Sequence, residues 1–156
     1  NIELRIVTAA VKANERQIAS VSEKIKSALN DVKGKTIAIL GLSFKPNTDD
    51  IREAPAISII QSLLDAGANI KAYDPVAMDN AKVILPQIIY CNDAYEACEG
   101  ADAAVIVTEW NQFRNLEPAK LMKMLKQPYF FDLRNIYDPQ KMKEAGFKYY
   151  SVGRSL

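Results

Sequence analysis

The sequence predicts an α/β fold in which a long N-terminal helix precedes a doubly wound, mostly parallel sheet. Its 156 residues are 49% hydrophobic and 25% charged, which fits one globular domain with an appendage and suffices for a core. About thirty residues at the N-terminus carry apolar side chains at helical spacing, without glycine or proline. From Gly34 onward, short apolar strands alternate with helical segments, the pattern of parallel strands joined by right-handed crossovers.

The N-terminal segment is expected to form one helix that ends near residues 33–35, where the first glycine occurs. Its seam positions repeat alternately every three and four residues, as in a coiled coil: Leu4, Val7, Val11, Asn14, Ile18, Val21, Ile25 and Ala28. Asn14 is the one polar member, and such a residue can set the register or the number of partners. A seam of this length favours a partner helix or another domain over packing on its own domain alone.

Strands and helices are expected to alternate through the rest of the chain. The strands are residues 36–40, 69–73, 88–91, 103–107, 129–132 and 148–151, and the main helices are residues 56–66, 94–99, 118–125 and 139–145. Residues 103–107 are apolar throughout, as a central strand covered on both faces should be. Ligands of doubly wound sheets bind beyond the carboxyl ends of the strands. The candidate site residues are therefore those just after the strands: 41–50, 74–75, 108–110 and 132–135.

Charge and hydropathy exclude several classes of function. The 20 Lys and Arg residues against 19 Asp and Glu residues give a net charge of +1, so no overall field draws the chain to nucleic acid or anionic lipid. No apolar run approaches the roughly 20 residues that span a bilayer, and no secretory signal is visible. We therefore expect a soluble, cytoplasmic protein without a nucleic-acid or membrane partner.

The absence of histidine limits the chemistry that this chain can perform. Without histidine it lacks the commonest general base and every Ser-His or Cys-His nucleophile. Cys91 and Cys98 bracket a short expected helix and match no metal-ligand spacing, so we interpret both as structural and expect no metal site. If the chain belongs to an enzyme, its catalytic groups lie elsewhere.

The turn after the first strand has the position of a nucleotide-binding turn but lacks its glycines. Residues 36–40 lead into Gly41, where a dinucleotide site would continue as Gly-x-Gly-x-x-Gly, and Phe44 and Lys45 follow instead. Pro46 stiffens the chain behind Lys45, which is expected near the sheet edge, where its ammonium group can pair with a phosphate or a sugar hydroxyl. The alternative is an ordinary solvated lysine.

A second cation follows the fifth expected strand. Arg134 comes directly after residues 129–132, at the same sheet edge as Lys45, and a guanidinium can hold a phosphate or carboxylate through two parallel hydrogen bonds. The two cations together predict an anion pocket. The alternative is a structural ion pair of Arg134 with Asp132 or Asp138.

A polar cluster at residues 48–55 leads into the next helix. Asp49 and Asp50 are expected to cap that helix and to orient Arg52 by charge-assisted hydrogen bonds. A magnesium site is disfavoured here, because Mg²⁺ normally relies on a substrate phosphate and further oxygens.

Three more residues lie near the predicted sheet edge. Asp74 ends the second strand, where a dinucleotide-binding domain has the acid that holds a ribose hydroxyl. Because the glycine fingerprint is absent and proline follows, a turn role is preferred for Asp74. Trp110 and Phe113 either stack on a base or close the core, and core closure is the more frequent role.

These motifs, taken in order, resemble the C-terminal UDP-binding domain of the UDP-glucose/GDP-mannose dehydrogenase family, in particular its members that oxidise UDP-glucose. The resemblance rests on GLSFKPNTDDIREAP from Gly41, YDP from Tyr73, TEW from Thr108 and FDLRNIYDP from Phe131. VKANERQ, from Val11, is similar to the end of the long central helix that joins the domains of these enzymes and forms their dimer interface.

The resemblance implies a Rossmann-like UDP-sugar-binding domain over residues 33–156 and the end of the dimerisation helix over residues 1–32, hence a homodimer. It implies that Phe44, Lys45 and Arg134 contact the UDP-sugar. Arg52 would reach NAD held mainly by a separate N-terminal domain. Such enzymes convert UDP-glucose to UDP-glucuronate in two NAD-dependent steps. The family's catalytic cysteine motif and NAD-binding domain are absent from these residues, so we expect no activity from this chain alone.

Two alternatives remain open. The same domain occurs in relatives that act on GDP-mannose or on a UDP-N-acetylhexosamine, and these residues do not decide the sugar or the base. The other alternative is a stand-alone nucleotide-binding module that dimerises through its first helix.

Overall fold

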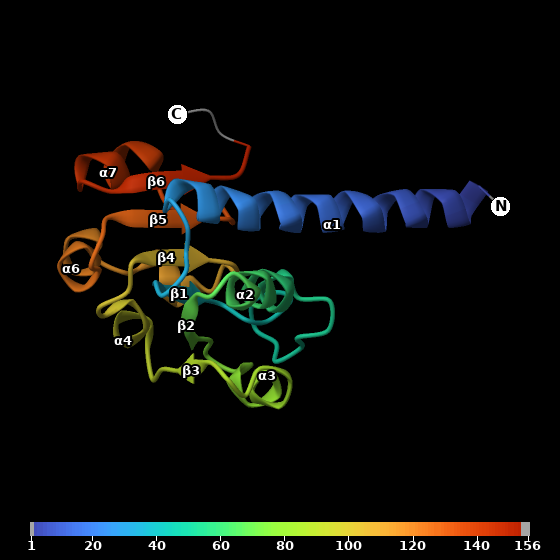
Figure 1. Ribbon diagram of the computed structural model, residues 1–156, viewed down its shortest axis with the longest axis horizontal. Coiled ribbons are helices and arrows are strands. Elements are labelled where there is room, and N and C mark those ends of the chain that lie inside the picture. The colour runs from blue at the N-terminus through green and yellow to red at the C-terminus, as the bar shows by residue number, and fades with distance from the viewer. Residues whose placement is uncertain (1, 154–156) are drawn as a thin grey trace.

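The computed structural model describes residues 2–153, which form seven helices and six strands (Figure 1). The helices are α1 (Ile2–Ala28), α2 (Pro55–Asp65), α3 (Met78–Ile84), α4 (Ala94–Cys98), α5 (Asn111–Arg114), α6 (Pro118–Met124) and α7 (Pro139–Glu144). The strands are β1 (Thr36–Leu40), β2 (Asn69–Tyr73), β3 (Ile89–Tyr90), β4 (Ala103–Ile106), β5 (Tyr129–Asp132) and β6 (Lys148–Ser151).

All six strands belong to one parallel sheet, in the order β3-β2-β1-β4-β5-β6. The chain winds outward from β1 in one direction and then from β4 in the other, so the order reverses between these two central strands. A crevice at the carboxyl ends of the strands is the usual ligand position in such a sheet. The predicted doubly wound, Rossmann-like α/β fold is confirmed.

Helices cover both faces of the sheet and enclose two apolar cores. On one face, α1, α2 and α3 pack around Ile37 and Ile39 of β1 and Val105 of β4. On the other face, α4 to α7 pack around Leu40 of β1 and Ile106 of β4. Because β1 and β4 contribute alternate side chains to each core, β1 is apolar from Ile37 to Leu40 and β4 is apolar along its whole length.

Helix α1 has a packed C-terminal part and an exposed N-terminal part. Its C-terminal part packs on α2, with Ile25 fully buried and Ile18 and Val21 partly buried against the first core. Residues 2–17 are exposed, and this part extends beyond the sheet on the side where the strands end (Figure 1). The two interpretations of the seam therefore apply to different turns of one helix: its end packs on its own domain, and its beginning does not.

Two short helices were not predicted, and both lie just beyond strand ends. Helix α3 follows the turn after β2, and the four-residue α5 follows β4. The N-caps of two expected helices are as the sequence indicates: Asp93 accepts a hydrogen bond from the amide of Glu96 at α4, and Asp138 accepts from two amides at α7.

Candidate functional site

The turn after β1 passes so close to β4 that only glycine fits at its first position. Gly41 has a φ of 95°, and its amide donates to the carbonyl of Tyr73 at 2.9 Å. A Cβ on Gly41 would lie 2.5 Å from the Cβ of Thr108. The glycine that the sequence shares with dinucleotide-binding turns is thus needed here for the approach of two loops.

Asp74 is fully buried and accepts hydrogen bonds from the turns after β1 and β2. One carboxylate oxygen, Oδ2, accepts from the amides of Leu42 and Ser43, from Ser43 Oγ and from Trp110 Nε1, at 2.7–3.3 Å. The other, Oδ1, accepts from the amides of Val76 and Ala77 at 2.9 and 2.8 Å. The preferred turn role of Asp74 is therefore confirmed. Asp74 also accepts hydrogen bonds from the turn after β1 and from the indole of Trp110.

This sheet edge does not fit a dinucleotide bound through the usual fingerprint. Residues 42–46 contain no further glycine, and both oxygens of Asp74 are committed to groups of the protein itself. No acid is left at the end of β2 to hold a ribose hydroxyl. In place of a glycine-rich backbone turn, this edge carries the side chains of Phe44, Lys45 and Arg134.

Phe44 and Lys45 are both exposed at the tip of the turn, Phe44 to 52%. The turn beneath them is fixed, because Thr108 Oγ1 donates to the carbonyl of Ser43 at 2.7 Å. Within residues 2–153, Lys45 makes neither a hydrogen bond nor an ion pair, which leaves all three of its donors available.

Arg134 lies after β5 and is held by Glu109, which follows β4. Its Nε and Nη2 donate to the two carboxylate oxygens of Glu109 at 2.5 and 3.0 Å. Neither acid named as an alternative partner pairs with the guanidinium: Asp132 accepts from the backbone amide of Arg134, and Asp138 caps α7.

Burial and the neighbouring Arg134 have opposite effects on the pKa of Glu109. Partial burial alone would raise the pKa of its carboxyl, but the hydrogen bonds and the charge of Arg134 lower that pKa below its ordinary value. Glu109 therefore stays ionised at neutral pH and keeps the guanidinium in one orientation. The edge Nη1–Nη2 remains free to donate to an anion.

Thr108 and Glu109 bring the predicted site residues together. Thr108 holds the turn that carries Phe44 and Lys45, and the next residue holds Arg134. The loops after β1, β4 and β5 thus meet at the carboxyl edge, beside the point where strand order reverses. Glu109 belonged to the segment expected to line the site, but its partner was not predicted.

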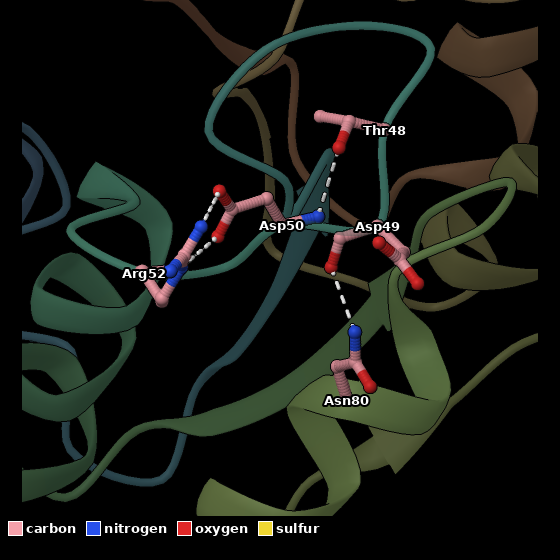
Figure 2. Close-up of polar contacts among 5 residues, drawn as sticks. All are labelled: Thr48, Asp49, Asp50, Arg52 and Asn80. Atoms are coloured by element: carbon pink, nitrogen blue, oxygen red, sulfur yellow. Dashed lines mark hydrogen bonds and ion pairs between the residues drawn. The ribbon is translucent and has the colours of Figure 1, made fainter.

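Asp50 orients Arg52 as expected, through two hydrogen bonds at 3.1 and 3.0 Å (Figure 2). The predicted cap was wrong. The N-cap of α2 is Ala54, which has no side-chain cap bond, and Asp49 and Asp50 lie too early in the loop. The amide of Asp50 donates to Thr48 Oγ1 at 3.2 Å, and Asn80 Nδ2 of α3 donates to the carbonyl of Asp49 at 2.9 Å.

A cavity of about 110 Å³ lies between α1 and the carboxyl edge, beside Arg134. Asn14 and Gln17 of α1 line it together with Leu133. Sequence reasoning assigned Asn14 to the helix seam and missed its place beside the site. The spacing of the two amides, one turn apart on one helix face, is the signal that was available.

Trp110, Phe113 and the two cysteines are buried. Trp110 and Phe113 are buried in the second core, and Trp110 also donates to Asp74, so core closure is confirmed for both. Cys91 and Cys98 are free and buried, and burial raises the pKa of Cys98 to about 12. In the described part of the chain, no three His, Cys, Asp or Glu residues group as metal ligands would.

None of the helices within residues 2–153 is long and apolar enough to cross a membrane.

A buried parallel sheet with cationic side chains at its carboxyl edge defines a nucleotide-binding α/β domain without a dinucleotide fingerprint. Residues 38–139 match the UDP-binding domain of the UDP-glucose/GDP-mannose dehydrogenase family, and the chain belongs to this family. The resemblance seen in the motifs is thereby confirmed.

Relatives are similar over nearly the whole chain. A UDP-glucose 6-dehydrogenase of Rhizobium meliloti (strain 1021) is 44% identical over 152 residues, which cover 97% of this chain and 35% of the relative. UDP-glucose 6-dehydrogenase TuaD of Bacillus subtilis (strain 168) is 42% identical over 96% of this chain and 33% of its own length. The structure of a UDP-glucose dehydrogenase from Pyrobaculum islandicum covers 95% of this chain and 32% of that one, with a TM-score of 0.79 and 27% identity.

The chain therefore spans about a third of the length of the curated relatives it matches.

Proposed function

We propose that this chain is the UDP-sugar-binding part of an NAD-dependent UDP-glucose 6-dehydrogenase, which oxidises UDP-glucose to UDP-glucuronate in two steps. The names of the similar proteins support the substrate, and the family supports a UDP-binding domain. Phe44, Lys45 and Arg134 contact the UDP-sugar. The chain itself supplies binding groups and no catalytic residue.

One observation carries this proposal: the loops after β1, β4 and β5 meet at one sheet edge, where the first carries Lys45 and the last carries Arg134, held by Glu109. A diphosphate needs such donors, and the Arg134 guanidinium keeps a free edge for it while Glu109 holds the other. Lys45 adds a mobile point charge, and Phe44 offers an exposed ring to the sugar or the base.

NAD is held mainly by another domain of the whole protein. The edge of this sheet does not fit a dinucleotide, whereas Arg52, with a side chain exposed to 89%, suits a single contact to an anionic group presented from outside. When bound, NAD accepts hydride from the substrate. The part of this chain is to hold the nucleotide of the substrate and to present Arg52.

The assembly proposed with this function is a homodimer. Residues 1–32 form the end of the central dimerisation helix, and residues 33–156 form the UDP-sugar-binding domain. The exposed apolar residues at the start of α1 support this division, among them Leu4, Val7 and Val11. The cytoplasmic location stays a prediction.

The anion pocket is tested by removing each cation in the full-length enzyme. Lys45→Ala and Arg134→Ala are each expected to raise the KM for UDP-glucose by about 10- to 100-fold, because a hydrogen bond to a charged group is worth about 1.5–3 kcal/mol. The KM for NAD should change little. Lys143→Ala, at an exposed lysine of α7, is the matched control. An unchanged KM for UDP-glucose in both variants would contradict the assignment.

Calorimetry separates the alternatives for the ligand. Binding of UDP-glucose in preference to GDP-mannose and UDP-N-acetylhexosamines supports the proposal, and the reverse preference supports another member of the family. Sugar-nucleotide binding by a full-length protein without any dehydrogenase activity would support the stand-alone binding module.

A further inference from the structure

The loop of residues 44–53 carries three of the proposed contacts, Phe44, Lys45 and Arg52, and Asp50 forms hydrogen bonds with Phe44 near its start and Arg52 near its end. The amide of Phe44 donates to the carbonyl of Asp50 at 2.7 Å, which closes the loop. The Asp50 side chain turns the other way, toward Arg52 (Figure 2). One residue thus connects the proposed substrate contact with the proposed cofactor contact.

The side chain of Asp50 holds Arg52 at three points. Oδ1 accepts from the backbone amide of Arg52 at 2.9 Å and from its Nε at 3.1 Å, and Oδ2 accepts from Nη2 at 3.0 Å. Two of the five guanidinium donors are used in this way, and the Nη1 end points away from the carboxylate. Glu109 holds Arg134 by the same two donors, Nε and Nη2.

This pair is poorly suited to stabilising the fold. The Arg52 side chain is 89% exposed, and ion pairs between exposed groups add little to stability. The hydrogen bonds from Arg52 nevertheless lower the pKa of Asp50, so the carboxylate stays charged over the neutral range. What the pair does is limit the rotamers of a long side chain that would otherwise be free.

The backbone below the pair is fixed at two further points. Thr48 Oγ1 accepts from the amide of Asp50, and Asn80 of α3 donates to the carbonyl of Asp49. Glu53, directly after Arg52, has a φ of 57°, which turns the chain sharply into α2. Arg52 is therefore presented from a built loop rather than from a free one.

We propose that Asp50 is a positioning residue, which aims Arg52 at the bound dinucleotide and ties that aim to the turn that carries Phe44. This inference rests on the proposed function, since it takes the contact between Arg52 and NAD as given. Beyond that contact, Asp50 is the residue that holds the exposed Arg52 side chain in the orientation in which it meets NAD.

The test compares two neighbouring acids in the full-length enzyme. Asp50→Asn is expected to raise the Kd of NADH, measured by fluorescence, and the KM for NAD, each by about 3- to 5-fold, the scale of one exposed ion pair. Asp49→Asn is the matched control. It makes the same change of charge one residue earlier, and no hydrogen bond or ion pair joins the Asp49 side chain to the other residues drawn in Figure 2.

A double-mutant cycle separates positioning from a general loss of structure. If Asp50 acts through Arg52, Asp50→Asn should add nothing to the effect of Arg52→Ala on NADH binding. Thermal unfolding checks that each variant is folded, and Asp50→Glu, which keeps the charge, should restore part of the affinity.

Three outcomes are distinguishable. Weaker NADH binding in both single variants, without additivity, supports the inference. Weaker binding for Arg52→Ala alone, or equal losses for Asp49→Asn and Asp50→Asn, overturns it and leaves the proposed function intact. Unchanged NADH binding for Arg52→Ala removes the cofactor contact and this inference with it, while the UDP-glucose site at Lys45 and Arg134 is judged by its own variants.

Discussion

Gly41 and Thr108 show how one close approach fixes the site at the scale of single residues. Any Cβ on Gly41 would overlap the Thr108 side chain and amide, at 2.5–2.7 Å. The same threonine holds the carbonyl of Ser43. A side chain at position 41 would therefore push apart the loop that carries Lys45 and the loop after β4.

Gly41→Ala is expected to lower the free energy of unfolding of this chain by about 3 kcal/mol. About 1–2 kcal/mol arises from the left-handed backbone and about 1–3 kcal/mol from overpacking against Thr108. Gly100→Ala is the matched control, since its φ is 72° and no atom lies within 4 Å of an added Cβ. Urea unfolding measures both variants. Equal losses would mean that the contact with Thr108 does not matter.

The sequence predicted the acid that pairs with Arg52, but not the acid that pairs with Arg134. Lys45 and Arg134 follow strands, and in a parallel sheet this is enough to place them at one edge. Asp50 is two residues from Arg52, so their pairing was within reach of local reasoning. Glu109 is 25 residues from Arg134, and many acids are as near in sequence. Only the pairing of β4 with β5 selects Glu109.

At the scale of elements, α1 combines a docked end and a projecting end. Ile25 belongs to the first core, and residues 2–17 are exposed. The seam of apolar residues runs through both parts and is interrupted by Asn14. The projecting part is therefore expected to bury its seam against a second copy.

Val7→Glu should weaken self-association of the chain by a factor of at least about ten, because each copy would bury a charge in an apolar seam. Its unfolding free energy should change by less than about 0.5 kcal/mol, since Val7 is exposed within one chain. Ala9 is not on the seam, so Ala9→Glu, which adds the same charge on the far side of the helix, is the control. Sedimentation velocity gives the result, and a monomeric wild-type chain would remove the dimer proposal.

Most helices and strands were predictable from the sequence, but helices α3 and α5 were not. The six strands and the main helices follow from apolar runs and from turns at glycine and proline. Helix α3 has seven residues and one fully buried side chain, Ala81, so its apolar face leaves almost no periodic signal. Helix α5 has only four residues, and Phe113 alone anchors it in the core.

At the scale of the whole molecule, the sheet belongs to both cores at once. Ile37 and Ile39 of β1 face the core under α1 to α3, and Ala38 and Leu40 face the core under α4 to α7. Both cores are therefore built on the same two central strands, β1 and β4. The two faces are therefore expected to unfold together, as single domains of this size usually do.

Thiol labelling of Cys98 tests this coupling across the sheet. Cys98 is fully buried in the second core, and burial raises its pKa to about 12, so a disulfide reagent at pH 8 reacts only when the chain opens. Ile25→Ala removes a fully buried side chain from the opposite core and should cost about 3 kcal/mol. In a Cys91→Ala background, Ile25→Ala should therefore speed the labelling of Cys98 by about 100-fold, since the labelling rate follows the population of the unfolded form.

The control for that experiment lies on the same helix. Val11→Ala, on the exposed part of α1, should leave the labelling rate of the monomer unchanged. If Ile25→Ala unfolded α1 alone, circular dichroism would fall while Cys98 stayed protected. A labelling rate that rises in step with the loss of unfolding free energy requires that the defect beneath α1 reaches α4 through the shared strands, which makes the sheet the cooperative unit of the molecule.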